Sequence, residues 1–157
     1  MTHHKISQED LYDMQLTHIK LSEFVTQEER LELLVTAYNT KDWIVHKSSV
    51  SGEISALHFI RIQKKFFDRD CLLMMMKPHT IQDWHSDKPG RDTVCIYPLT
   101  DNYAPCEMEP DIFINTPALI NTQMRHRVVN NDQMRINLQI PFNESLEEVC
   151  VNYDFTR

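Results

Sequence analysis

His85 and Asp87 lie one residue apart in QDWHSDKPGRD, residues 82–92. In an extended segment, residues i and i+2 point to the same side, so this imidazole and this carboxylate can reach one metal ion. A third ligand must come from elsewhere, and His126 is the only histidine later in the chain. Two imidazoles and one carboxylate leave three adjacent coordination positions open, which suits non-haem Fe(II). The His-x-Asp spacing alone is common by chance, so the argument depends on the strands around it.

The segment 135–142 alternates strictly between polar and apolar residues. Its side chains divide between two faces, with Arg135, Asn137 and Gln139 on one and Ile136, Leu138, Ile140 and Phe142 on the other. One interpretation places the polar set in water over an apolar core. The other places it inside the mouth of a barrel. We expect a hairpin turning near Asn131 to bring His126 towards this strand, so that His126 and Arg135 line one pocket.

Short β-rich runs follow Trp43, with turn residues between them, up to residue 142. Runs of this length and spacing are typical of a sandwich, jelly roll or barrel. We therefore predict a mainly β protein, a jelly-roll or cupin-like barrel with N-terminal helices packed on its outside. One domain over residues 1–157 is expected, with a helical part over about 1–42 and the barrel over about 43–157.

A capping box of Thr26 and Glu29 predicts that a helix starts there and ends near Asn39. Its apolar residues at i, i+3, i+4 and i+7 predict the buried stripe, which comprises Leu31, Leu34, Val35 and Tyr38. A weaker helix is expected from about Ser7, and residues 14–21 fit either a helix or an edge strand. His3 and His4 are left out of the metal hypothesis because they are as consistent with an added tag as with the native chain.

The order HSD, then HRVVN, then an arginine nine residues after the second histidine resembles the Fe(II)/2-oxoglutarate-dependent dioxygenases. The resemblance covers roughly residues 70–142. The stretch HRVVNND is similar to the aspartyl/asparaginyl and prolyl hydroxylase-like branches, although several aspartyl hydroxylases lack the metal-binding Asp that this chain has. It implies a double-stranded β-helix in which His85, Asp87 and His126 bind Fe(II). It also implies that Arg135 pairs with the distal carboxylate of 2-oxoglutarate, for which a planar guanidinium is well suited. Asn137 stands where many members have Ser or Thr, and its amide is expected to contribute to binding of the 2-oxoglutarate carboxylate.

The resemblance implies hydroxylation of a small molecule or of an amino-acid or peptidyl side chain. O₂ would be consumed and 2-oxoglutarate would be decarboxylated to succinate. We expect Tyr97 to donate to 2-oxoglutarate, and Trp84 and Arg91 to contact the substrate, with Arg91 holding an anionic group. His79 and the rest of KPHTIQDW are expected in a loop. No particular substrate or oligomeric state follows from these residues.

The composition favours a cytoplasmic protein without nucleic-acid or membrane partners. The net charge of −7 argues against binding to a phosphate backbone, no apolar run is long enough to span a bilayer, and the N-terminus MTHHKISQED lacks a signal-peptide core. The four cysteines are far apart and are expected to be reduced thiols, mostly in the core. Two alternatives remain: a cupin-type isomerase or hydrolase with another metal at the same triad, and a barrel that only binds ligands.

Overall fold

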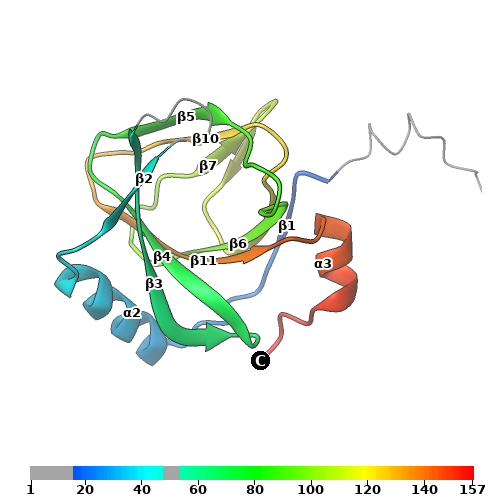
Figure 1. Ribbon diagram of the computed structural model, residues 1–157, viewed down its shortest axis with the longest axis horizontal. Helices are drawn as coiled ribbons and strands as arrows, with labels where there is room; N and C mark the ends of the chain where they lie inside the picture. Colours follow the sequence, from blue (N-terminus) through cyan, green and yellow to red (C-terminus); the bar gives the residue numbers. More distant parts are fainter. Residues whose placement is uncertain (1–15, 48–53) are drawn as a thin grey trace, which may run out of the picture.

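The computed structural model describes residues 16–47 and 54–157, in which two antiparallel sheets face each other (Figure 1). The larger sheet has seven strands in the order β1 (His18–Lys20), β9 (Ala118–Asn121), β6 (Thr93–Pro98), β11 (Arg135–Phe142), β4 (Arg69–Met76), β3 (Ile54–Phe66) and β2 (Ile44–Lys47). The smaller sheet has four strands in the order β5 (Ile81–His85), β10 (His126–Val129), β7 (Cys106–Met108) and β8 (Ile112–Ile114). The predicted mainly β, jelly-roll fold is confirmed.

The large sheet has a main core on its outer face and smaller apolar clusters on its inner face. On β11, Ile136 and Leu138 are fully buried beneath α2 (Gln27–Asn39) and α3 (Leu146–Asn152), together with Leu33 and Val149 from these helices. Between the sheets, Met74 and Val128 belong to one of two smaller clusters. The polar residues of β11 therefore face the space between the sheets.

Helix α2 begins and ends where the sequence predicts, but its buried face differs from the prediction. The capping box is present, with Thr26 N donating to Glu29 Oε1 at 3.0 Å and Glu29 N donating to Thr26 Oγ1 at 3.1 Å. Only Leu34 of the predicted stripe packs on the core. The other three members are 55–62% exposed, namely Leu31, Val35 and Tyr38. The buried positions are Glu29, Leu33 and Ala37.

The contacts of Arg30 and Glu29 explain why α2 is rotated away from the predicted orientation. Arg30 donates through both Nε and Nη2 to the carbonyl oxygen of Leu99, at 2.9 and 2.7 Å. Glu29 forms ion pairs with Arg157 at 2.6 Å and with Lys64 at 3.0 Å. These long-range contacts turn the Leu33 and Ala37 side of the helix towards the sheet. Hydrophobic periodicity cannot predict them, because it considers only residues within the helix.

Glu29 makes the stability of the protein dependent on pH. Its hydrogen bond with Arg157 is the main reason why the pKa of Glu29 falls from 4.5 to about 2, although burial opposes the shift. A lowered native pKa stabilises the fold above pH 4.5, and this contribution disappears as the pH falls towards 2. We expect Glu29→Gln to lower the free energy of unfolding by about 2 to 3 kcal/mol at pH 7. Urea unfolding at pH 7, 4 and 2.5 should show this difference shrinking; a difference independent of pH would contradict the assignment.

Two segments differ from the sequence-based expectations, and a third takes one of the two forms that were expected. The stretch expected as a helix or an edge strand contains the edge strand β1, which pairs with β9. The stretch expected as a loop contains β5, because Ile81–His85 pairs with β10. The predicted hairpin between residues 126–130 and 135–142 does not form, since β10 pairs with β5 and β7 while β11 pairs with β4 and β6. The chain instead crosses between sheets near Asn131.

The predicted helix from Ser7, together with His3 and His4, lies outside the described residues. In the described part of the chain, no helix is long and apolar enough to cross a bilayer. Cys71, Cys95 and Cys106 are buried and Cys150 is exposed, so most of the cysteines lie in the core, as predicted. The division into residues 1–42 and 43–157 stays a prediction, although β1 already belongs to the large sheet.

Candidate metal centre

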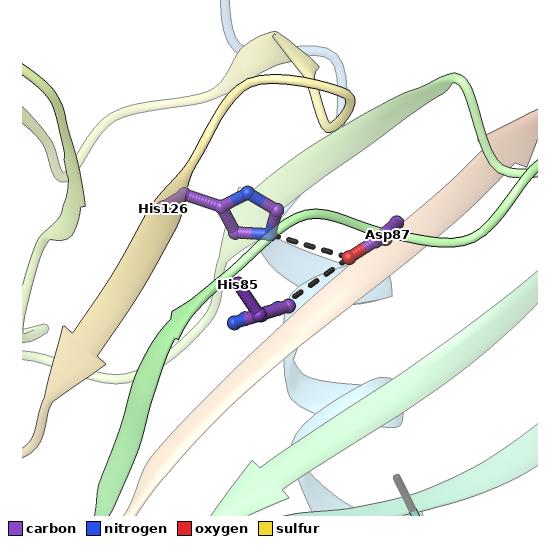
Figure 2. A group of neighbouring side chains, drawn as sticks. All are labelled: His85, Asp87 and His126. Carbon is purple, nitrogen blue, oxygen red and sulfur yellow. Dashed lines mark ion pairs between the residues drawn. The ribbon is translucent and has the colours of Figure 1, made fainter. Parts of the chain in front are cut away.

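Three side chains of the small sheet and its following loop converge between the two sheets. His85 ends β5 and His126 begins β10, and the two residues are Cα partners across this strand pair. Asp87 follows β5, and its Oδ1 lies 3.4 Å from His85 Nε2 and 3.3 Å from His126 Nε2 (Figure 2). One ligand atom from each residue lies within 4.8 Å of the others. Within residues 16–47 and 54–157, no other such group of His, Cys, Asp or Glu occurs.

Both imidazoles present Nε2 to Asp87 because their other nitrogen is held by the backbone. His85 Nδ1 lies 2.7 Å from the Asp83 carbonyl oxygen, and His126 Nδ1 lies 2.8 Å from the Met124 carbonyl oxygen. A carbonyl only accepts, so Nδ1 carries a proton in each ring, and Nε2 is the nitrogen that can bind a metal once its own proton is lost. This arrangement orients histidine ligands in metal sites.

Asp87 is fixed at its backbone and at its second carboxylate oxygen. Its N–H donates to the Thr122 carbonyl at 2.8 Å, and Gln123 Nε2 donates to the Asp87 carbonyl at 3.3 Å. Arg91 Nε lies 3.3 Å from Asp87 Oδ2, and Arg91 Nη2 donates to Gln139 Oε1 at 2.9 Å. Oδ2 is thus taken by Arg91 while Oδ1 faces the imidazoles, so the carboxylate offers one oxygen to a metal.

The charges around Asp87 keep its carboxylate ionised. Burial by itself would raise the pKa of Asp87, but the hydrogen bonds with His126 and His85 and the charge of Arg91 hold that pKa well below its ordinary value. Burial lowers the pKa of His85, yet the hydrogen bonds to Asp87 and Asp83 outweigh it and leave this pKa raised. An anionic oxygen beside two imidazole nitrogens is a donor set for a divalent transition metal.

An irregularity in β5 places two of its residues at the site. His126 and Val128 of β10 pair with His85 and Gln82, so three steps along β5 match two along β10. The extra residue breaks strict alternation and allows both Gln82 and His85 to line the same cavity. Gln82 Nε2 lies 3.2 Å from His85 Nε2. The sequence contains no signal for this bulge.

Arg135 lies across the cavity from the small sheet and has an unused donor. It is 4% exposed, its Nε donates to the Ala104 carbonyl at 2.9 Å, and its guanidinium lies over the Tyr103 ring at 4.1 Å. Nη2 is buried with no hydrogen-bond partner. A buried cationic donor without an acceptor is costly, so this atom indicates a place for an anionic group.

Asn137 and Tyr103 lie beside Arg135. Asn137 Nδ2 donates to the Tyr103 hydroxyl oxygen at 2.8 Å, and Asn137 Oδ1 is buried without a partner. The Tyr103 hydroxyl hydrogen is thus available to another acceptor. Burial raises the pKa of Tyr103 to about 12, so the hydroxyl is a donor at neutral pH. Sequence analysis did not select Tyr103, because it lies in an irregular loop.

A cavity of about 50 Å³ joins the triad to Arg135. The polar members of its lining outside the triad include Gln82, Arg91, Thr122, Arg135 and Gln139, and the apolar members include Leu57, Met74, Val94 and Ile96. The cavity thus contains a metal-binding donor set and a cationic side chain with apolar walls. The second of the two interpretations of the strand β11 is therefore the correct one, because its polar face lies in this interior rather than in water.

Two residues predicted to contact ligands face away from this cavity. Tyr97 packs in the core under α2, with its ring centroid 4.8 Å from that of Phe24, because it lies on the face of β6 opposite Val94 and Ile96. This position is inconsistent with the predicted contact with 2-oxoglutarate. Trp84 is not among the cavity-lining residues; Arg127 lies over its ring at 4.8 Å. Trp84 is the neighbour of His85 and stacks with Arg127, the neighbour of His126, outside the cavity, so the predicted substrate contact is not supported.

Arg91 → Ala is expected to weaken metal binding without removing a metal-binding atom. The guanidinium orients Asp87, and loss of such a partner typically lowers metal affinity by about 10- to 100-fold. Absorption titration with Co(II) would measure the affinity, and Arg125→Ala is the matched control, because Arg125 pairs with exposed Glu109 instead. Equal Co(II) affinity in Arg91→Ala and the wild type would show that Arg91 does not position Asp87.

No protein-family model matches this chain, and no curated protein matches it in sequence. Solved structures do match. A Trichoplax adhaerens prolyl hydroxylase, in complex with a hypoxia inducible factor peptide fragment, aligns with a TM-score of 0.63 and 11% identity over 92% of this chain and 90% of that one. The chain has the fold of the 2-oxoglutarate–Fe(II) oxygenases.

Two further oxygenase structures support this assignment of the fold. A Pseudomonas putida prolyl-4-hydroxylase aligns with a TM-score of 0.60 and 11% identity, covering 86% of this chain and 96% of that one. An oxidoreductase of the 2OG-Fe(II) oxygenase family from Burkholderia pseudomallei aligns with a TM-score of 0.57 and 10% identity, covering 87% and 89%. The resemblance seen in the sequence is therefore confirmed at the level of the fold.

Proposed function

We propose that the protein is an Fe(II)- and 2-oxoglutarate-dependent dioxygenase that hydroxylates a small molecule or an amino-acid or peptidyl side chain. The observation that carries the proposal is one cavity that contains both the triad, with its ligand atoms within 4.8 Å, and the unpaired Nη2 of Arg135. A metal site with open positions and a buried cation suits a cosubstrate that chelates the metal and carries a second carboxylate.

The residues present fit Fe(II) and 2-oxoglutarate. His85 Nε2, His126 Nε2 and Asp87 Oδ1 would hold the metal, since each faces the same space and the backbone holds only the Nδ1 atoms of the two imidazoles. Arg135 Nη2 and the Tyr103 hydroxyl would donate to the distal carboxylate. When bound, iron and 2-oxoglutarate supply O₂ activation coupled to decarboxylation to succinate.

The protein itself positions the metal-binding side chains and excludes water from the cavity. The backbone carbonyls of Asp83 and Met124 orient the imidazoles, and Arg91 keeps Asp87 Oδ2 away from the open side. Leu57, Met74, Val94 and Ile96 give the cavity apolar walls, which strengthen electrostatic contacts inside it. Cys106 also lines the cavity but is not part of the triad, and burial raises the pKa of its thiol to about 11.

Release of labelled CO₂ from 2-oxoglutarate labelled at C1 would test the proposal. We expect CO₂ release that requires both Fe(II) and O₂, with one succinate formed per CO₂. Without a substrate to hydroxylate, this release should be slow and should keep the same requirements and ratio. Asp87→Ala should reduce release to the background rate. Tight binding of both Fe(II) and 2-oxoglutarate with no release above background would contradict the proposed activity.

A further inference from the structure

A second hollow, a groove of about 710 Å³, lies at the end of the hairpin formed by β3 and β4. Its apolar lining includes Leu72 of β4 and Pro141 of β11, and it is bordered by Gly90 and Arg91 from the loop after β5. Arg91 is the one residue in the described part of the chain that lines both this groove and the metal cavity, so the two spaces are separate sites. The proposed function uses only the metal cavity and leaves the groove without a role.

The lining of the groove is cationic, although the chain has a net charge of −7. It includes four cationic side chains and two acidic ones, namely Arg61, Lys65, Arg69 and Arg91 with Asp68 and Asp70. Lys65 lies 3.7 Å from Asp70, but both side chains are mostly exposed, so this ion pair is weak. A concave site with an excess of one charge concentrates ions of the opposite charge, so the groove favours an anion.

Two of the guanidinium groups flank Leu72. Leu72 is the Cα partner of Arg61 on β3 and of Gln139 on β11, so these three side chains lie on the same face of the large sheet. Arg91 Nη2 donates to Gln139 Oε1 at 2.9 Å, which places this second guanidinium over β11. Since neighbouring strands are about 5 Å apart, the Cα atoms of Arg61 and Gln139 are about 10 Å apart. One small molecule with an acidic group at each end is able to contact both arginines across this separation.

Arg61 is available to a ligand, whereas Arg69 is part of the fixed wall. Arg61 is exposed and has no hydrogen-bond or ion-pair partner among residues 16–47 and 54–157. Arg69 donates to the Pro141 carbonyl and to the Tyr153 hydroxyl, each at 2.9 Å, and its guanidinium lies over the Phe142 ring at 4.4 Å. A planar guanidinium without a partner suits a carboxylate or a phosphate, which it binds through two parallel hydrogen bonds.

The size and the mixed lining of the groove favour a small organic molecule as its occupant. Its volume of about 710 Å³ lies within the roughly 300 to 1,000 Å³ of small-molecule sites. Leu72 and Pro141 offer apolar surface to a carbon skeleton, and the cationic side chains stand around them. An inorganic ion would use the charges alone and leave this apolar surface uncovered.

We propose that this groove is a second binding site, which takes a small organic molecule carrying two or more carboxylate or phosphate groups. Arg61 contacts one acidic group and Arg91 contacts another, while the carbon skeleton lies against Leu72 and Pro141. The inference goes beyond the proposed function, because neither a metal nor 2-oxoglutarate takes part in this binding.

Isothermal titration calorimetry on the full chain, without added metal and at constant ionic strength, would test the site. The probes are citrate, which carries carboxylates, and fructose 1,6-bisphosphate, which carries phosphates, with acetate as the anion that has a single charge. We expect at least one of the two larger probes to bind at least about tenfold more tightly than acetate, and the tighter of the two identifies the preferred acidic group. If neither bound more tightly than acetate, the proposal would be overturned.

Three variants locate the binding. Arg61→Glu should weaken binding of the tighter probe by about tenfold or more, because a like charge replaces a partner, and it should leave Co(II) affinity unchanged. Lys20→Glu is the matched control, since Lys20 is an exposed residue of β1 at the opposite edge of the sheet and undergoes the same change in charge. Arg135→Ala should bind the probe as the wild type does, because Arg135 lines only the metal cavity. Equal losses in Arg61→Glu and Lys20→Glu, or a loss only in Arg135→Ala, would overturn the assignment to the groove.

Discussion

His126→Ala is expected to lower the affinity for Fe(II) by at least about 100-fold. Loss of a residue that merely orients a ligand lowers metal affinity by about 10- to 100-fold, and His126 contributes a ligand atom itself. Its Nε2 lies 3.3 Å from Asp87 Oδ1, and its side chain is only 9% exposed. Water entering the truncated site would not replace an imidazole nitrogen of fixed orientation.

Anaerobic titration with Co(II) in place of Fe(II) would measure this loss through the visible absorption of the bound ion. His18→Ala is a suitable control, because His18 lies on the edge strand β1 and contacts Thr17. Circular dichroism would verify that both variants fold, and His126→Gln would retain more of the buried volume. If His126→Ala bound Co(II) as tightly as the wild type, the metal would be held at another site.

Arg135→Ala should weaken 2-oxoglutarate binding by about 100-fold and leave metal binding intact. Removing one partner of a buried, hydrogen-bonded charge pair costs about 3 kcal/mol, which corresponds to about 100-fold in affinity. Arg135 Nη2 is a buried donor without an acceptor, and no atom of Arg135 belongs to the triad.

Comparing the affinities for pyruvate and 2-oxoglutarate tests this prediction, because pyruvate has the same 2-oxo acid group but lacks the distal carboxylate. The wild type should bind 2-oxoglutarate much more tightly than pyruvate, whereas Arg135→Ala should bind both with similar, weak affinity. Arg135→Lys should be intermediate, since it keeps the charge and loses the planar fork. If Arg135→Ala lowered the affinity for both ligands equally, Arg135 would not be the partner of the distal carboxylate.

The sequence predicted the chemistry-bearing residues better than the path of the chain between them. The alternation in 135–142 correctly separated Arg135 and Asn137 from Ile136 and Leu138, because side chains on a strand alternate whatever the neighbouring strands are. It did not distinguish an aqueous face from an interior one. Only the second sheet, lying over these polar residues, decides that question.

The predicted hairpin was wrong for a related reason. A turn at Asn130-Asn131-Asp132 is compatible both with pairing of the flanking strands and with a crossover between sheets. In this fold Asn130 Nδ2 donates to the carbonyls of Lys77 and Gln133, each at 2.9 Å, and these bonds fasten the crossover to the end of β4. His126 and Arg135 still line one cavity, but from opposite sheets.

The tyrosine near Arg135 could not be identified from local patterns. Tyr97 was a reasonable candidate because it lies on a strand, yet strand β6 turns it into the outer core with Phe24. Tyr103, in an irregular loop, is the residue that stacks on Arg135. Placing a loop residue depends on long-range contacts, such as Arg135 Nε with the Ala104 carbonyl, which no short-range periodicity encodes.

Visible absorption of the Fe(II)-loaded protein, titrated with 2-oxoglutarate without oxygen, tests the proposed site most directly. We expect a weak charge-transfer band from chelation, present in the wild type, absent in Asp87→Ala, and requiring more 2-oxoglutarate in Arg135→Ala. Pyruvate should give a band only at much higher concentration. No band in the wild type, with Fe(II) shown to be bound, would contradict the assignment of 2-oxoglutarate to this cavity.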